Sequence, residues 1–353
     1  MFKVAIIGTG LPWKTEGATG FGMSRAHAPG YAKSGKCEIV ALSDLKETSM
    51  TEFNVDFCNG KARQYTDYKQ MLAAEKPDIV SIATWPHLHA EMTIGAAESG
   101  VKAIHCEKPM AGTFGEARRM AAVCAERGVQ LTFNHQRRHL PAFQTAKKLI
   151  AEGAIGELTR LEGSCSNLLD WGTHWLNMFQ MLNGEAAPLW VMGQVDYRKP
   201  HQVYGVIHDT DGMCLVGYEN GVHGLLCTGE TAEKAVGCSI KAIGTEGTLE
   251  LHNTAPHICL RKGSTLEELT GAETEGGLHG GFANHDNVVD LVNALENGTK
   301  PLCDVSNALA TTEIIYACYE SARRRGRIDL PLTIDDHPLV ALVASGAYPA
   351  TAP

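Results

Sequence analysis

A short apolar run that ends in two glycines stands near the start of the chain, where residues 2–10 read FKVAIIGTG. A buried strand that leads directly into Gly8-Thr9-Gly10 is typical of a dinucleotide-binding fold, where glycine permits a tight turn and close approach of the pyrophosphate. The third glycine of this fingerprint is delayed by the segment Leu11–Thr19, after which the chain reads Gly22-Met23-Ser24. We interpret the segment as an insertion, with Ser24 in the place of the third glycine and a helix that opens near Gly22 facing the pyrophosphate.

Apolar runs continue to alternate with helix-like segments as far as residue 134. Further strands are expected at residues 38–42, 78–83, 101–106 and 129–133, and helices at 87–99 and 114–127. Short β-rich runs separated by helices indicate βαβ units, and hence a parallel sheet with helices on both faces. The sequence therefore predicts an N-terminal Rossmann dinucleotide-binding domain over residues 1–134, within a chain of the α/β class.

The pattern changes over residues 135–353. Helices are expected at 141–152 and 174–182, and strand candidates then follow one another at 189–197, 213–218, 222–228, 238–243 and 248–251. Asn220-Gly221, between two of these strands, favours a hairpin. Two helices at 283–296 and 308–325 precede a loop-like tail. Consecutive strands predict an α+β domain with a large, mostly antiparallel open sheet.

Composition excludes several classes of protein. The 353 residues carry a formal net charge of −9, which gives no basic footprint for nucleic acid or an anionic membrane surface. No run approaches the ~18 apolar residues of a membrane span, and the first apolar run is too short for a signal peptide. The 11 cysteines show no CxxC spacing, and no HExxH or Cys/His pattern occurs. We expect reduced thiols, a cytoplasmic location, no metal, and no nucleic-acid or membrane partner.

Asp44 ends the second predicted strand. A carboxylate at this position can accept hydrogen bonds from both ribose hydroxyls of the adenosine half, and it repels a 2′-phosphate. We therefore predict NAD, with NADP less favoured and Lys46 as the main argument for NADP. The alternative is that Asp44 caps the following helix.

Three polar segments stand out beyond the glycines. They are Thr84-Trp85-Pro86-His87-Leu88-His89, Glu107-Lys108-Pro109 and Asp170-Trp171-Gly172-Thr173-His174. Two of them follow predicted parallel strands, and open α/β sheets bind ligands at the carboxyl ends of such strands. With Tyr319-Glu320-Ser321-Ala322 near the C-terminus, this set resembles the Gfo/Idh/MocA family of glucose–fructose oxidoreductases and inositol dehydrogenases, and the resemblance covers essentially the whole chain.

The resemblance implies that Lys108, Asp170 and His174 form the catalytic group of an NAD(P)-dependent dehydrogenase. Such an enzyme moves a hydride between the nicotinamide and a secondary hydroxyl of a sugar, sugar derivative or cyclitol. A neutral histidine suits the removal of the hydroxyl proton, and a lysine can stabilise the developing negative charge. Asp170 would orient the imidazole or tune the lysine. The residues expected to bind the cofactor are Gly8, Thr9, Gly10, Gly22, Met23, Asp44, Thr84, Trp85, His89, Glu107 and Lys108.

A sugar-like substrate is expected to contact aromatic and polar side chains, because sugar C–H faces pack on rings while hydroxyls seek polar partners. Trp85 is either such a contact or a packed core residue, and Arg138 either contacts substrate or pairs with another side chain. Asn177 stands where the family often carries a second aspartate. Trp13 and Lys14 in the insertion could form a lid over the cofactor. The residues expected to bind substrate are Trp85, Lys108, Arg138, Asn167, Asp170, Trp171 and His174, with Trp175 beside them.

Two rival functions remain open from the sequence. Some members of the family keep the dinucleotide bound and use transient oxidation of a ring carbon to cleave a glycosidic bond, with the same lysine, aspartate and histidine. A non-catalytic sugar-sensing regulator is the other, although it would be expected to lack those groups. The resemblance also implies a homo-oligomer, a dimer or tetramer paired through the sheet of the second domain.

Overall fold

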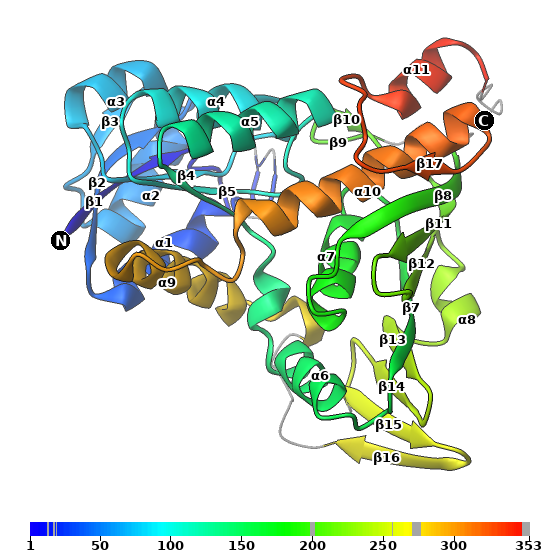
Figure 1. Ribbon diagram of the computed structural model, residues 1–353. Coiled ribbons are helices and arrows are strands. Elements are labelled where there is room, and N and C mark those ends of the chain that lie inside the picture. The colour runs from blue at the N-terminus through cyan, green and yellow to red at the C-terminus, as the bar shows by residue number, and fades with distance from the viewer. Residues whose placement is uncertain are drawn as a thin grey trace. The chain divides into compact units, whose positions relative to one another are not determined.

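The computed structural model describes residues 1–12, 14–16, 18, 20–197, 202–255, 257–269 and 277–347 (Figure 1). The chain forms two compact units. The first comprises Met1–Gly112, Glu116–Gln136 and Gly281–Ala308, and the second comprises Thr113–Gly115, Arg137–Gly280 and the chain from Leu309. None of the described helices has the length and apolar character that a bilayer crossing requires.

The first unit contains a six-stranded parallel sheet in the order β3-β2-β1-β4-β5-β6. Every residue of β4 and β5 is buried, because helices cover both faces of the sheet. The predicted Rossmann architecture is confirmed. The strands are β1 (Phe2–Ile7), β2 (Cys37–Ser43), β3 (Arg63–Tyr65), β4 (Ile79–Ile82), β5 (Ala103–Cys106) and β6 (Gln130–Phe133), and the helices along this part of the chain are α1 (Ser24–Ser34), α2 (Glu47–Cys58), α3 (Tyr68–Glu75), α4 (Pro86–Glu98) and α5 (Phe114–Glu126).

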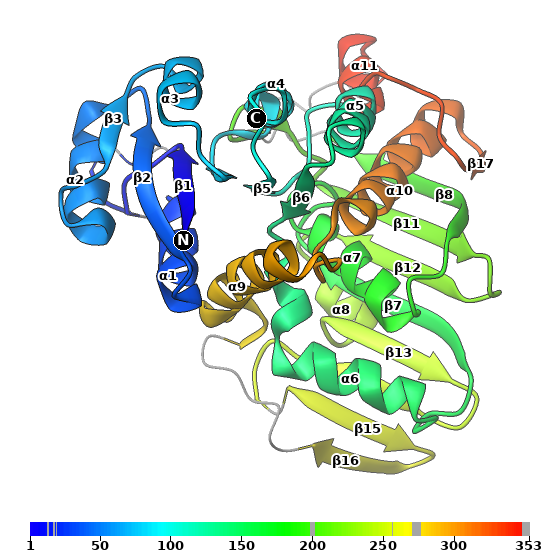
Figure 2. The same ribbon diagram turned by 60° about the vertical axis from the view of Figure 1, so that its left-hand side comes forward.

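Helix α9 (Phe282–Asn297) lies beside α1 in both ribbon views (Figures 1 and 2). The sequence-based division assigned this helix to the second domain, whereas in the structure it belongs to the first unit. The physical reason is its apolar face: Val288, Leu291 and Val292 are fully buried in one core cluster with residues of α1, α2 and the sheet. Gly30 of α1 permits the close approach, since a Cβ there would stand 2.7 Å from that of Val288.

The second unit contains a nine-stranded sheet in the order β16-β15-β14-β13-β7-β12-β11-β8-β17. All neighbouring strands are antiparallel except β7 and β12, which run parallel, so the predicted mostly antiparallel sheet is confirmed. The strands are β7 (Leu158–Cys165), β8 (Pro188–Asp196), β11 (Asp211–Tyr218), β12 (His223–Thr228), β13 (Ile240–Gly244), β14 (Thr248–Leu251), β15 (Ile258–Lys262), β16 (Thr265–Leu269) and β17 (Ile328–Asp329), and β9 (Gln202–Val203) pairs separately with β10 (Val206–Ile207).

The predicted loop-like tail is wrong, because it contains β17 and the helix α11 (Pro338–Ala344). Strand β17 pairs with β8 at the edge of the sheet. The remaining helices are α6 (Pro141–Ala151), α7 (Gly172–Leu182), α8 (Ala232–Val236) and α10 (Val305–Arg324), with short 3₁₀ turns η1 (Gln136–His139) and η2 (Gly277–His279).

Helix α7 is buried along its whole length and packs on β7 and β12. Glycines in those strands make room for it: a Cβ on Gly163 would lie 3.0 Å from Cζ of Phe179, and one on Gly224 would lie 2.9 Å from its Cδ2. The predicted catalytic motif, residues 170–174, spans the start of this helix, so the packing of α7 on the sheet holds the backbone of the motif in place.

Candidate active site

The glycine loop follows β1 and is built by close backbone contact. Gly10 has φ of 56°, and a Cβ there would stand 2.9 Å from Cα of Gly22, so the two chain segments touch across the intervening residues. Gly8 has φ of 86° and lies against the carbonyl oxygen of Ala83. Ser24 opens α1, and its buried hydroxyl donates to the Thr9 carbonyl oxygen at 2.7 Å. The loop therefore closes at Gly10 and Gly22 despite the segment between them.

The segment between these glycines is described only in part. Lys14 is exposed and has φ of 68°. Trp13, Gly17 and Thr19 lie outside the described residues, so the idea of a lid that includes Trp13 stays a prediction.

Asp44 lies against the glycine loop. Its Oδ2 accepts hydrogen bonds from the Thr9 N–H at 2.8 Å, the Thr9 hydroxyl at 3.0 Å and the Gly10 N–H at 3.2 Å. Its Oδ1 accepts from the N–H of Lys46, and Lys46 itself is the N-cap of α2, so Asp44 does not occupy the N-cap position. The carboxylate that follows β2 is therefore held against the glycine loop by these hydrogen bonds.

The segment after β4 divides into an exposed and a buried part. Trp85 is 40% exposed and its ring lies 5.9 Å from that of His87, so Trp85 is not a packed core residue. The Thr84 hydroxyl lies 3.4 Å from the sulfur of Met92. His89 is fully buried, with Nδ1 2.9 Å from the Pro109 carbonyl oxygen and Nε2 3.1 Å from that of Thr84. His89 thus links this segment to the Glu107–Pro109 segment, and burial lowers its pKa.

Lys108 follows β5 and is partly exposed, whereas its neighbour Glu107 is buried. Oε1 of Glu107 accepts from His27 Nε2 at 2.8 Å and from Asn134 Nδ2 at 2.7 Å, and Oε2 accepts from the Lys108 N–H at 3.2 Å. Burial alone would raise the pKa of Glu107, but the hydrogen bond and charge of His27, the charge of Lys108 and the Asn134 hydrogen bond outweigh it and lower the pKa. The Glu107 carboxylate, which was expected to bind the cofactor, is therefore engaged inside the protein, where it holds the backbone of Lys108.

This support continues into the helices of the first unit. His27 on α1 has its Nδ1 2.9 Å from the Ser81 hydroxyl, and Asn134 donates to Asn284 Oδ1 at 2.8 Å. Asn287 on α9 donates to Asn134 Oδ1 at 3.1 Å. No pattern in the sequence points to His27, whereas Asn134 directly follows the predicted strand at 129–133. A buried polar network of this kind rigidifies the group it surrounds when its members are satisfied.

In the second unit, Asp170 lies in the loop that precedes α7, and His174 lies in the first turn of that helix. Oδ1 of Asn167 accepts from the backbone N–H groups of Asp170 at 2.8 Å and Trp171 at 3.2 Å, and its carbonyl accepts from Gly172 at 2.9 Å. Asp170 is 9% exposed and His174 4%. Asn167, a predicted substrate contact, is therefore engaged in shaping the loop that carries Asp170.

The two neighbouring arginines separate in role. Arg138 is buried and donates from Nε to Asn177 Oδ1 at 2.6 Å and from its terminal nitrogens to Glu185, so its geometry fits the pairing alternative rather than a substrate contact. The guanidinium carbon of Arg137, Cζ, lies 4.1 Å from the centre of the Trp175 ring and 5.5 Å from the centre of the Trp171 ring. Burial lowers the pKa of Arg137 to about 9, opposed by the nearby Cys165 and Asp170.

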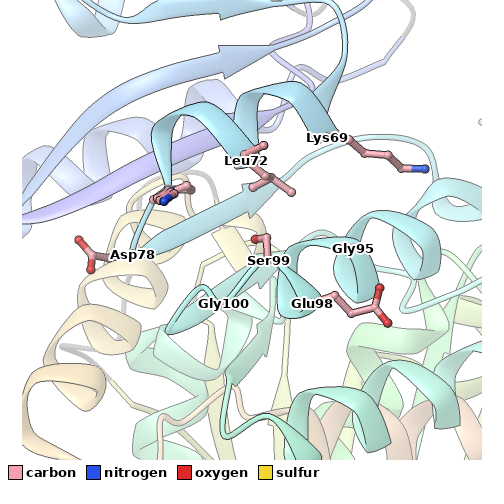
Figure 3. A pocket seen from close by; sticks show the side chains of 10 residues that line it. Lys69, Leu72, Asp78, Gly95, Glu98, Ser99 and Gly100 are labelled. Atoms are coloured by element: carbon pink, nitrogen blue, oxygen red, sulfur yellow. The ribbon is translucent and has the colours of Figure 1, made fainter.

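A separate groove of about 650 Å³ lies between α3 and α4 of the first unit (Figure 3). Two of its charged groups are paired: Lys69 Nζ lies 3.0 Å from Glu91 Oε1, and Asp78 Oδ1 lies 2.8 Å from Lys102 Nζ. Asp78 precedes β4, whereas the motif residues follow their strands, so the groove lies at the opposite end of the sheet. Within the described ranges, no group of three or more His, Cys, Asp or Glu side chains is arranged to hold a metal ion.

Comparison with known proteins gives matches over both units. A family model described as GFO_IDH_MocA, oxidoreductase family, NAD-binding Rossmann fold, matches residues 2–135, and the corresponding C-terminal alpha/beta domain matches residues 147–330. D-apiose dehydrogenase of Paraburkholderia graminis is 27% identical, covering 98% of this chain and 94% of that protein. The NADP(+) D-xylose 1-dehydrogenase of Haloarcula marismortui is 26% identical and covers 93% of each chain.

The structure also resembles solved structures. That of levoglucosan dehydrogenase, in complex with NADH and levoglucosan, has a TM-score of 0.76 and 22% identity, covering 94% of this chain and 100% of that chain. At this identity the likeness shows the shared fold alone.

Proposed function

Because this chain belongs to the Gfo/Idh/MocA oxidoreductase family, we propose that it is an NAD-dependent dehydrogenase acting on a secondary hydroxyl of a sugar, a sugar derivative or a cyclitol. The observation that carries the proposal is the presence of Lys108 on a buried polar support and of Asp170 and His174 at the buried start of α7. The names of the similar proteins, D-apiose dehydrogenase and D-xylose 1-dehydrogenase, support a sugar as the substrate class.

The residues of the first unit fit a dinucleotide. Gly8 and Gly10 let the loop after β1 pack against Ala83 and Gly22, which is the tight turn that precedes the pyrophosphate site in a dinucleotide fold, and α1 begins directly after it. When bound, NAD supplies the acceptor for the hydride. Asp44 favours NAD over NADP because its carboxylate would repel a 2′-phosphate, although one of the similar proteins carries NADP(+) in its name. Exposed Trp85 would pack on the nicotinamide or on a sugar face.

The chemistry assigned to the chain is proton removal and charge stabilisation. His174, in the first turn of α7, would take the proton of the substrate hydroxyl. The Lys108 ammonium would donate a hydrogen bond to the same oxygen and stabilise its developing negative charge. Asp170 would orient the imidazole. Trp171, which is partly exposed, would face the apolar side of a ring, with the buried Trp175 and Arg137 packed beside it.

The test is a screen of sugars and cyclitols with NAD and NADP, in which the absorbance of the reduced nicotinamide is followed. We expect one polyol class to reduce NAD and the Lys108→Met variant to lose roughly 10²–10⁴-fold in kcat. Lys102→Met is the matched control, because Lys102 is exposed and pairs with Asp78. Full turnover of Lys108→Met would overturn the assignment of the lysine. Sugar release without net reduced cofactor would support glycoside cleavage instead, and binding of sugar without turnover would support a sensor.

We further propose that the chain is a homo-oligomer paired through the open face of the large sheet. Apolar side chains gather there on neighbouring strands: Met192 is 53% exposed on β8 and Met213 59% on β11. Exposed apolar side chains on adjacent strands favour burial against another surface.

A further inference from the structure

A buried carboxylate, that of Asp209, holds the loop that leads into α7. Asp209 is 1% exposed, and the N–H of Leu168 donates to its two oxygens at 3.0 and 2.9 Å. Leu168 lies inside the loop Asn167–Trp171, two residues before Asp170. The proton and charge steps assigned above do not use Asp209, so its burial next to the motif requires another explanation.

Tyr319 supplies the second contact of this carboxylate. Its hydroxyl donates to Asp209 Oδ1 at 2.7 Å, across 110 positions of the chain, and the Thr228 hydroxyl donates to Oδ2 at 3.1 Å. Burial and the neighbouring Asp209 raise the pKa of Tyr319 far above its ordinary value, so the phenol remains a donor. Asp209 thus joins the loop to α10 and to β12.

Tyr319 is itself held in place, whereas its neighbours in the sequence motif act locally. The His337 ring stacks on the Tyr319 ring at 5.5 Å with an interplanar angle of 23°. Glu320 pairs with arginines on the same helix, and Ser321 donates to the Gly326 carbonyl at 2.6 Å. Of the Tyr319–Ala322 motif, Tyr319 is therefore the residue whose side chain ties α10 to the Asn167–Trp171 loop.

We propose that Asp209 and Tyr319 are positioning residues, which hold Leu168 and through it fix Asp170 and His174 for the reaction. This inference rests on the proposed function of Asp170 and His174. A carboxylate with three donors from separate elements defines one position, and loss of one donor or of the acceptor leaves buried polar groups unpaired.

The experiment compares Tyr319→Phe, Asp209→Ala and Asp209→Asn with the parent protein. Tyr218→Phe is the matched control: it removes a phenol oxygen equally buried in the second unit, one with no hydrogen-bond partner among the described residues. Hydrogen–deuterium exchange of the peptide covering residues 166–176 is measured without substrate. The kcat/KM for the polyol that the substrate screen identifies and the Kd for NAD are measured well below the melting temperature.

We expect Tyr319→Phe and Asp209→Ala to speed exchange of this peptide and to lower kcat/KM roughly ten-fold, with the Kd for NAD within about two-fold of the parent. Asp209→Asn keeps an acceptor oxygen for Leu168 and should recover part of both losses. Unchanged exchange in Tyr319→Phe, faster exchange with unchanged kcat/KM, or an equal loss in Tyr218→Phe would each overturn the proposal. If the parent oxidises no polyol, the proposed function fails, and the exchange measurement still decides whether Asp209 and Tyr319 hold the loop.

Discussion

Replacement of Glu107 is the most direct test of the support beneath Lys108. In Glu107→Ala, His27 Nε2, Asn134 Nδ2 and the Lys108 N–H all lose their acceptor in a site where the parent side chain is 5% exposed. A buried donor left without its acceptor costs about 1–3 kcal/mol, and three donors are affected here, so we expect a loss of about 3 kcal/mol or more. Glu107→Gln keeps an oxygen for His27 and Asn134 but turns an amide donor toward the Lys108 N–H, so we expect a loss of about 1–2 kcal/mol.

Guanidinium unfolding of the full chain, followed by fluorescence, measures both variants, with Glu98→Ala as an exposed control expected within about 0.5 kcal/mol of the parent. Because the pKa of Glu107 is lowered in the folded state, its contribution is present above its ordinary value of 4.5 and is lost as the pH falls below that value. The difference between parent and Glu107→Gln should therefore shrink in acid. If Glu107→Ala lost less than about 1 kcal/mol, or if Glu107→Gln lost as much as Glu107→Ala, the reasoning would be refuted.

Three further outcomes are expected. Burial, with a smaller effect of His208, lowers the pKa of His337 from 6.5 to about 4. The unfolded chain therefore takes up this proton first, and the free energy of unfolding should fall by up to roughly 3 kcal/mol as the pH falls from 7 to 4. His337→Phe should remove that part of the dependence of stability on pH, and an unchanged dependence would contradict the prediction. Gly10→Ala would drive a Cβ against the Gly22 backbone, and we expect the Kd for NAD to rise at least roughly ten-fold by calorimetry; unchanged affinity would place the cofactor elsewhere. The double variant Met192→Lys, Met213→Lys should be a monomer by light scattering, whereas the parent should be an oligomer. A parent protein that is itself monomeric would contradict the proposed interface.

The first unit could be predicted closely because its signals are local. Five strands of the parallel sheet, β1, β2, β4, β5 and β6, are largely apolar runs, and a glycine pair stands at the turn after β1. Strand β3 was not predicted, because its residues are polar and mostly exposed. In the second unit β7, β15 and β16 were missed. In β7, Gly163 interrupts the pattern in the middle of the strand. Glycine is needed at this position because the rings of Trp175 and Phe179 pack directly against it. Strand propensities do not include such contacts with distant residues.

Partners distant in the sequence could not be predicted. An amphipathic helix such as α9 shows which of its faces is buried but not which surface covers it. Arg137 and Arg138 are adjacent and chemically identical, so only the structure separates the one on the tryptophans from the one on Glu185. The contact of Asp209 with Tyr319 depends on the packing of α10 and has no local signal at either residue.

The place of α9 in the first unit has a consequence for how this protein can be recombined. The nucleotide-binding half is not a continuous piece of chain, because Val288, Leu291 and Val292 complete its core from beyond residue 280. A single genetic crossover near residue 136 would join one parent's sheet to another parent's covering helix. Hybrids of that kind should be soluble only where the two sequences preserve the fit at Gly30, whereas a transfer that also carries Gly281–Ala308 keeps the whole core together.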